Sequence, residues 1–309
     1  MKEFNNRQIA NKFAEYITGD ELRRYVADKV KKYVGKDVTV FDGACGSGQL
    51  EQYVNPKFLY GVEIQEQAVE TCKENYTNSE IIHNSFFNHK SNVLADCIIM
   101  NPPFSIKFKE LSEEEQDNIK ANFPWKKSGV VDDIFILKSL EHTKRYGFYI
   151  CFPGIMYRKS EKKLRELLGN TVQEMNIIEN AFEDTPIQVL FLVIDKDKNS
   201  NKVYQELYNC KTKEIINSRE IELEDDSWER ISEPTIEEVI DIDQIEKDLN
   251  NDTLNHIKKH LETTLVIYSH FDRDCGINDW IEEANRILKE YQQRYLTIKK
   301  SKEEMMWWS

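Results

Sequence analysis

Residues 38–50, with the sequence VTVFDGACGSGQL, determine the fold expected for this chain. The mostly apolar residues 38–41 predict a short buried strand. A glycine-rich turn follows at residues 42–48, and a helix is expected from about Gln49. Glycines let the backbone of such a turn approach a ligand closely, with the N–H groups of the following helix facing it. The stretch therefore predicts the strand, ligand-binding loop and helix of an α/β protein.

Strands and helices alternate on the carboxyl side of this stretch, which favours a parallel, doubly wound sheet. Helices are expected at residues 66–75, 131–142 and 161–168. Two more helices, at residues 5–17 and 21–34, precede the first strand and form an N-terminal segment, residues 1–35. Seven strands are expected, and together they predict a mixed, mostly parallel sheet. Besides the strand at residues 38–41, they lie near residues 58–62, 80–83, 96–100, 147–152, 174–178 and 188–194.

A polar segment at residues 195–202 predicts a domain boundary. We expect a catalytic domain at residues 1–198 and a smaller α+β region at residues 199–309. In that region, residues 203–208 and 214–217 favour a hairpin, and helices are expected near residues 235–240, 254–263 and 280–300.

The ligand of the glycine turn has two interpretations. A dinucleotide is the usual ligand of such turns, but the spacing GxGxxG is not met after Gly46. Glu63 ends the next expected strand, where an acid binds the paired hydroxyl groups of a ribose. A solvated acid at a strand end is the alternative for Glu63. Because Glu63 and the turn belong to successive strands, we expect both to bind one nucleoside.

A second unusual stretch, Asn101-Pro102-Pro103-Phe104, follows the apolar strand expected at residues 96–100. The prolines keep this segment, the NPPF loop, extended and stiff, and they have no N–H groups. Asn101 and the loop carbonyls can accept hydrogen bonds, and Phe104 adds a flat apolar face. Acceptors beside an aromatic ring suit an amino group on a planar ring. A proline-stiffened loop without catalytic function is the alternative.

In order and spacing, FDGACGSGQL, YGVEI, HNSFF and IIMNPPF resemble the amino-group DNA methyltransferases that use S-adenosylmethionine. The position of the glycine turn before NPPF is similar to the gamma group of adenine-N6 enzymes. The stretches VDDIFILKSL and NAFEDTPIQVLFLVIDK resemble the modification subunits of type I restriction–modification systems. The resemblance covers residues 7–195, and it implies a Rossmann-like, S-adenosylmethionine-dependent methyltransferase fold.

The resemblance also implies roles for individual residues. Asn101, Pro102, Pro103 and Phe104 would form the catalytic site. The methionine moiety would lie against Thr18 and the turn residues Asp42, Gly43, Ala44, Cys45, Gly46 and Gly48. Glu63 would bind the ribose, and Ile64, Ser85 and Phe86 the adenine. Two positions depart from the family, which usually has proline at Gly43 and aspartate at Ser85. The first departure predicts a more flexible turn and the second a weaker hold on adenine.

The charge distribution limits where nucleic acid can bind. The net charge is −13, and most of it lies in residues 201–309, which hold 15 basic and 25 acidic residues. Residues 1–200 hold the remaining 27 basic and 30 acidic residues and are nearly balanced in charge. The first two thirds can therefore carry a basic surface for DNA phosphates. Solvation alone is the alternative explanation of these charges. The DNA-binding residues expected at the rim of the sheet are Lys107, Lys109, Lys126, Lys127, Arg158 and Lys159.

Together these patterns predict methyl transfer from S-adenosylmethionine to adenine N6 of duplex DNA, with the target base flipped out of the helix. S-adenosylhomocysteine would be the product, and no metal ion would be required. Two alternatives remain: methylation of a glutamine side chain or an RNA base, and a subunit that works only with a specificity partner. The partners expected are DNA and either such a subunit or further copies of the chain.

The location expected is the cytoplasm. The six cysteines show no CxxC or zinc-site spacing, and no apolar run is long enough to span a membrane. The N-terminus also lacks the apolar core of an export signal.

Overall fold

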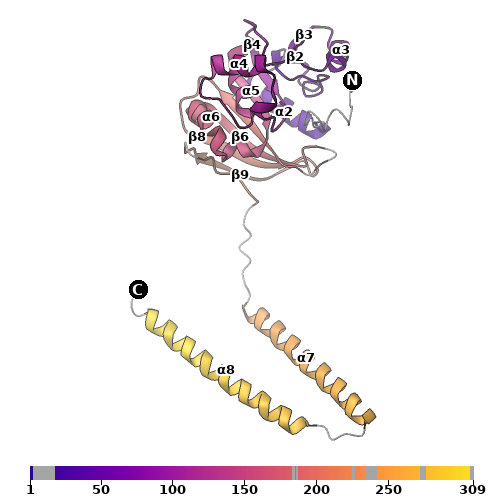
Figure 1. Cartoon of the computed structure of the whole chain (residues 1–309), viewed down its shortest axis with the longest axis vertical. Helices are drawn as coiled ribbons and strands as arrows, with labels where there is room; N and C mark the ends of the chain where they lie inside the picture. The colour runs from indigo at the N-terminus through magenta and orange to yellow at the C-terminus, as the bar shows by residue number, and fades with distance from the viewer. Residues whose placement is uncertain are drawn as a thin grey trace. The chain divides into compact units, whose positions relative to one another are not determined.

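The computed structural model describes residues 1–2, 18–182, 185, 187–224, 227–233, 242–271 and 276–306. It forms two compact units, Met1–Thr235 and Ile236–Ser309 (Figure 1). The helices expected at residues 5–17 and 235–240 lie outside the described residues. Within the described part of the chain, no helix combines the length and apolarity needed to cross a membrane.

The described part of the first unit is built on one mixed sheet in the order β3-β2-β1-β4-β5-β7-β6-β8-β9. Strands β3, β2, β1, β4 and β5 are parallel neighbours. β7 runs antiparallel between β5 and β6, β8 pairs parallel with β6, and β9 runs antiparallel to β8. The strands are β1 Thr39–Asp42, β2 Phe58–Glu63, β3 Ser79–His83, β4 Ala95–Met100, β5 Thr143–Cys151, β6 Val172–Glu179, β7 Val189–Asp195, β8 Lys202–Asn209 and β9 Glu214–Glu222.

The mixed, mostly parallel α/β fold is confirmed, but the sheet has nine strands rather than seven. The expected hairpin forms as β8 and β9, and β8 extends the sheet by pairing with β6. This pairing satisfies backbone N–H and C=O groups that the edge of β6 would otherwise expose. The first compact unit therefore continues past residue 198 to Thr235, and the polar segment at 195–202 is a connection within the sheet.

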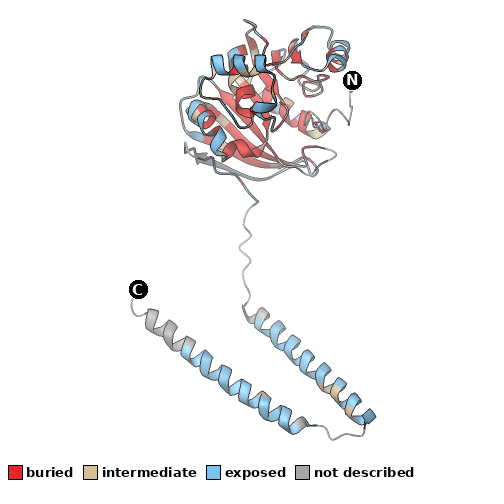
Figure 2. Cartoon of the chain, viewed as in Figure 1, coloured by how far each residue is buried: buried red, intermediate tan, exposed pale blue. Residues whose placement is uncertain are grey.

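Helices cover both faces of the sheet, as a doubly wound fold requires. α2 and α3 contribute Leu22 and Val69 to one buried cluster, whereas α5 and α6 contribute Ile134 and Leu164 to the other. Figure 2 shows the buried sheet between helices whose outer faces are exposed. The helices of this unit are α2 Asp20–Tyr33, α3 Glu66–Asn75, α4 Glu113–Asn122, α5 Asp132–Ser139 and α6 Lys162–Leu168.

The prediction of a helix from about Gln49 is wrong, because residues 50–54 form turns. Only seven residues separate Gly48 from Pro56, and proline disfavours a helical conformation at Asn55. Asn55 instead has a left-handed backbone with φ of 49°. Helix α4 was not predicted, because its polar sequence lacks a strong apolar period. Ser112 starts this helix by accepting a hydrogen bond from the Glu115 N–H.

In the second unit the described residues form two long helices, α7 Ile242–Phe271 and α8 Ile277–Met306. The helices expected near residues 254–263 and 280–300 are thus confirmed. The rings of His260 and Trp280 are stacked with centroids 6.2 Å apart, which is a contact between the two helices. Large apolar side chains are exposed on both, among them Leu265, Phe271, Leu288 and Tyr291.

Candidate active site

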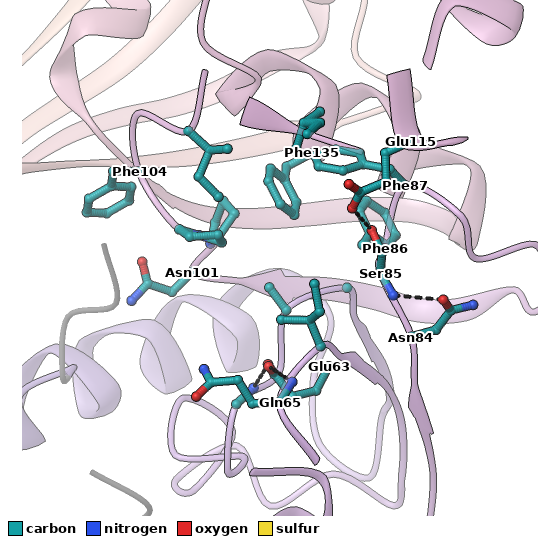
Figure 3. Close-up of a pocket in the computed structure, with 18 of the residues that line it drawn as sticks. Glu63, Gln65, Asn84, Ser85, Phe86, Phe87, Asn101, Phe104, Glu115 and Phe135 are labelled. Atoms are coloured by element: carbon teal, nitrogen blue, oxygen red, sulfur yellow. Dashed lines mark hydrogen bonds between the residues drawn. The ribbon is translucent and has the colours of Figure 1, made fainter. Parts of the chain in front are cut away.

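A cavity of about 480 Å³ lies where β1, β2, β3 and β4 end. Because these strands are parallel neighbours, the loops that follow them meet at one edge of the sheet. A cavity of this size is typical of small-molecule sites. Figure 3 shows the arrangement. The lining residues are Gly43, Ala44, Gly46, Glu63, Ile64, Gln65, Asn84, Ser85, Phe86, Phe87, Asn101, Pro102, Pro103, Phe104, Ile106, Glu110, Leu111, Glu115 and Phe135.

The turn after β1 needs glycine at two positions. Gly46 and Gly48 have left-handed φ angles of 51° and 77°, which residues with a side chain rarely adopt. A Cβ at Gly48 would lie 2.4 Å from the ring of Tyr76. The Tyr76 hydroxyl donates a hydrogen bond of 2.7 Å to the Gly48 carbonyl. Tyr76, the residue that follows α3, therefore fixes the end of the turn.

Gly43, where the family resemblance leads one to expect proline, also has a steric reason to be glycine. An added Cβ would lie 2.7 Å from the ring of Phe86 and 2.9 Å from the Met100 Cε atom. Such contacts are too short for any real Cβ. Packing of Phe86 onto the Gly43 backbone therefore takes the space that a larger residue would need.

Glu63 lies at the end of β2 with its carboxylate beside the glycine turn. Its Oε2 atom accepts a hydrogen bond of 2.9 Å from the Gly46 N–H. Its Oε1 atom accepts one of 2.8 Å from the Gln65 N–H. Two backbone donors thus fix an almost fully buried carboxylate at the cavity wall. An acceptor held in this way suits the hydroxyl groups of a ribose.

Asp42 and Glu51 are two buried carboxyl groups beside the glycine turn. The Asp42 Oδ1 atom accepts a hydrogen bond of 2.8 Å from the Ala44 N–H. Burial, followed by the charge of Glu51, raises the pKa of Asp42 well above its usual range. Burial raises the pKa of Glu51 to about 8. Sequence reasoning missed Glu51, because its place beside Asp42 depends on the turns at residues 50–54.

The Asn101 side chain has its two ends in different surroundings. Its Nδ2 atom donates a hydrogen bond of 3.1 Å to the Thr18 hydroxyl. Its Oδ1 atom is buried and has no hydrogen-bond partner among the described residues, and Asn101 lines the cavity. A buried acceptor without a partner is costly. Within the described residues, the Asn101 Oδ1 atom is therefore an unsatisfied acceptor on a loop that lines the cavity.

Thr18 lies in an antiparallel bridge with Phe182. Thr18 is almost fully buried. It does not line the cavity, and neither do Asp42, Cys45 and Gly48. Seven of the eleven cofactor-binding residues predicted from the sequence line the cavity, together with all four residues of the NPPF loop. Those seven are Gly43, Ala44, Gly46, Glu63, Ile64, Ser85 and Phe86.

The family of the chain follows from comparison with known proteins. Residues 1–269 match the family model described as N-6 DNA Methylase. The chain belongs to the N-6 DNA methylase family. This confirms the family expected from the glycine turn and the NPPF loop.

A curated relative is the type I restriction enzyme MjaVIII methylase subunit of Methanocaldococcus jannaschii. The two chains are 22% identical over 335 residues, an alignment that covers 95% of this chain and 57% of the relative. The chain therefore spans little more than half the length of that relative.

Solved structures with the same fold include a type I restriction–modification methyltransferase subunit from Streptococcus thermophilus. It has a TM-score of 0.54 and 18% identity, over 62% of this chain and 47% of that one. A modification subunit of a putative type I restriction enzyme from Vibrio vulnificus gives a TM-score of 0.54 and 16% identity. That match covers 67% of this chain and 52% of the other. At these identities the similarity concerns the fold alone.

Within this N-6 DNA methylase, the structure divides the predicted DNA-binding residues into two groups. Lys107, Lys109, Lys127 and Lys159 are exposed. Lys126 is buried and pairs with Asp133 at 2.6 Å, so its prediction as a phosphate contact is wrong. Arg158 is partly buried over the Phe152 ring at 4.8 Å. Sequence alone did not distinguish these groups, because a lysine beside a loop can point in either direction.

A buried acid supports the end of the NPPF loop. Ser105 has a left-handed φ of 62°, and its N–H donates a hydrogen bond of 2.9 Å to the Asp132 Oδ1 atom. Arg158 lies 4.0 Å from the other oxygen of Asp132. Burial raises the pKa of Asp132 to about 6. Asp132 therefore connects the start of α5 to the loop that carries Asn101.

Phe104, expected to present a flat apolar face at the catalytic site, is almost fully buried. Its ring lies 6.3 Å from that of Phe182, with the planes inclined by 54°. Phe182 is itself buried in the core cluster that contains Phe104. Phe104 thus belongs both to the core and to the lining of the cavity.

Eight of the residues that line the cavity were not predicted from the sequence, among them Phe135 and Glu115. Phe135 of α5 stacks on Phe86 with ring centroids 5.7 Å apart and planes inclined by 10°. Glu115 of α4 accepts a hydrogen bond from the Ser85 hydroxyl. The spacing of Ser112 and Glu115 is a capping-box signal that would have located the start of α4. No local signal places α4 against Ser85.

Proposed function

We propose that this chain transfers a methyl group from S-adenosylmethionine to adenine N6 in DNA, as part of a restriction–modification system. The main support is the Asn101 Oδ1 atom, a buried acceptor that has no partner among the described residues and belongs to a cavity-lining side chain. An amino group attached to a planar ring offers the donor that this oxygen requires. Family membership and the position of Glu63 at the other side of the cavity agree with this function.

The lining of the cavity fits S-adenosylmethionine. Ala44 and Gly46 would hold the methionine moiety, Glu63 the ribose, and Ile64 and Phe86 the adenine. Bound there, this compound supplies an electrophilic methyl group on a sulfonium. Asp42, Cys45 and Gly48 would act indirectly, because they shape the turn from outside the cavity.

The NPPF loop would hold and orient the target amino group. Asn101 Oδ1 and the Pro102 carbonyl would each accept one of its hydrogen bonds. This arrangement favours a pyramidal nitrogen, whose lone pair is then available for in-line attack on the methyl carbon. The C–S bond would break as the N–C bond forms, S-adenosylhomocysteine would leave with the bonding pair, and the methylated nitrogen would lose one proton to solvent. Positioned acceptors of this kind lower the barrier by electrostatics and orientation. The buried Phe104 and Phe182 exclude water from one side of the loop.

Duplex DNA would have to present a flipped adenine, since a stacked base cannot enter the cavity. The exposed Lys107, Lys109, Lys127 and Lys159 are the candidates for phosphate contacts. The acidic C-terminal unit suits a partner, either a specificity subunit or another copy of the chain, better than it suits DNA. An enzyme that modifies cellular DNA in this way would work in the cytoplasm.

The experiment compares Asn101→Ala with the wild type in the transfer of labelled methyl groups to unmethylated bacterial DNA. Loss of one preorganised polar group at the reacting atoms lowers turnover by about 100- to 1000-fold. Binding of S-adenosylhomocysteine should be unchanged, because Glu63 and the glycine turn are intact. Asn122→Ala, at an exposed position of α4, is the matched control.

If the wild-type chain alone is silent, the assay is repeated with the partner proteins of its operon, which tests dependence on a specificity subunit. Label on N6-adenine supports the proposal. Wild-type turnover in the Asn101→Ala variant would contradict it.

A further inference from the structure

One end of the cavity contains an acidic side chain, Glu115, that belongs to helix α4 and not to the segment that follows β3. The resemblance leads one to expect aspartate at position 85, where the chain has serine. In the structure the Ser85 hydroxyl donates a hydrogen bond to the Glu115 Oε1 atom. Glu115 belongs to α4, thirty positions further along the chain, and both residues line the cavity. Figure 3 shows the two side chains in contact.

Helix capping fixes the Glu115 carboxylate. Its Oε2 atom accepts hydrogen bonds of 2.8 Å from both the N–H and the hydroxyl of Ser112. The Glu115 N–H in turn donates to the Ser112 hydroxyl at 3.3 Å. With Oε2 held by the start of the helix, Oε1 is the oxygen that meets Ser85. An ionised carboxylate only accepts hydrogen bonds, so Oε1 has capacity for a second donor.

Helix α4 is itself anchored on the loop after β3. The Asn118 Nδ2 atom donates a hydrogen bond of 2.9 Å to the Asn88 Oδ1 atom. The next residue of the helix, Ile119, is buried in the core. Together with the Ser85–Glu115 pair, these contacts hold α4 at a defined distance from the strand end. Glu115 is therefore a fixed part of the cavity wall.

We propose that Glu115 accepts a hydrogen bond from the cofactor's adenine amino group, and thereby selects adenine over a 6-oxo purine. The inference rests on the proposed function, since it assigns the base of the cofactor to this end of the cavity. Glu63 would bind the ribose from the preceding strand, which places the base next to Ile64, Ser85 and Phe86. The edge of an adenine there presents a donor, and Glu115 is the carboxylate beside it.

The selectivity has a direct physical basis. A 6-oxo purine places an acceptor oxygen where adenine has its amino group, so it would face the carboxylate without a hydrogen bond. A hydrogen bond to a charged group contributes enough to change affinity by about 10- to 100-fold. Replacement of Glu115 by glutamine keeps the size of the side chain, removes the charge and adds an amide donor.

The test measures equilibrium binding of S-adenosylhomocysteine and S-inosylhomocysteine to the full chain by calorimetry. The wild type should bind the adenine compound about 10- to 100-fold more tightly. In the Glu115→Gln variant this ratio should fall at least about ten-fold. Glu114→Gln, an exposed neighbour on the same helix, should keep the wild-type ratio.

An unchanged ratio in Glu115→Gln, or an equal loss of affinity for both compounds, would overturn the inference and leave Glu115 as a helix cap. Either result is compatible with methyl transfer that depends on Asn101, so the proposed function would survive it. Wild-type protein that binds neither compound would count against both.

Discussion

The Thr18 hydroxyl provides a test of how the catalytic amide is oriented. The family resemblance predicts that Thr18 touches the methionine end of the cofactor, whereas in the structure it accepts a hydrogen bond from Asn101 at 3.1 Å. Without this bond, the amide of Asn101 could rotate and turn its NH₂ group toward the cavity. A Thr18→Val substitution removes the hydroxyl and retains a branched side chain at a buried site.

The size of the effect follows from that single contact. A neutral hydrogen bond contributes about 0.5–1.5 kcal/mol, so the ratio of the productive to the flipped orientation of the amide would fall by about 2- to 12-fold. Turnover should fall by at most about 12-fold, well short of the loss of about 100-fold or more expected for Asn101→Ala. Affinity for S-adenosylhomocysteine should stay unchanged, since Thr18 does not line the cavity.

The assay pairs single-turnover methyl transfer with calorimetric binding of S-adenosylhomocysteine. Thr18→Ser is the matched control, because it keeps the hydroxyl and should keep wild-type turnover. If Thr18→Val weakened cofactor binding and left turnover intact, the reasoning from the Asn101 contact would be refuted. The role implied by the family resemblance would then apply.

Two more predictions concern buried charges. The pKa of Asp132 is raised to about 6 in the folded chain, above its unfolded value, so its ionisation lowers the free energy of unfolding progressively as the pH rises from about 4 to about 6. The Asp132→Asn substitution should therefore raise the free energy of unfolding more at pH 8 than at pH 4, by at most about 3 kcal/mol as measured by urea unfolding. An equal effect of the substitution at both pH values would contradict this. Lys126→Ala should lower the free energy of unfolding by about 3–5 kcal/mol, because it leaves the buried Asp133 unpaired. Lys127→Ala should instead weaken DNA binding and leave the free energy of unfolding unchanged. Urea unfolding and DNA titration measure the two effects, and the reverse pattern would restore Lys126 as a phosphate contact.

The sequence by itself determined the features that depend on neighbours along the chain. Gly46 and Gly48 identify the ligand turn, because their left-handed backbones nearly require glycine. The prolines of the NPPF loop identify a stiff segment after a buried strand. The order of these two motifs led to the family, and the seven strands expected from apolar runs all form.

Only the tertiary structure decided which distant residues meet at the site. Asn101 pairs with a residue 83 positions away, and Ser85 with one 30 positions away. Neither pairing has a local signature, since it depends on how Thr18 and α4 pack against the sheet. The same reason applies to Lys126, whose burial against Asp133 is invisible in a run of charges, and to β8, whose membership in the sheet depends on the open edge of β6.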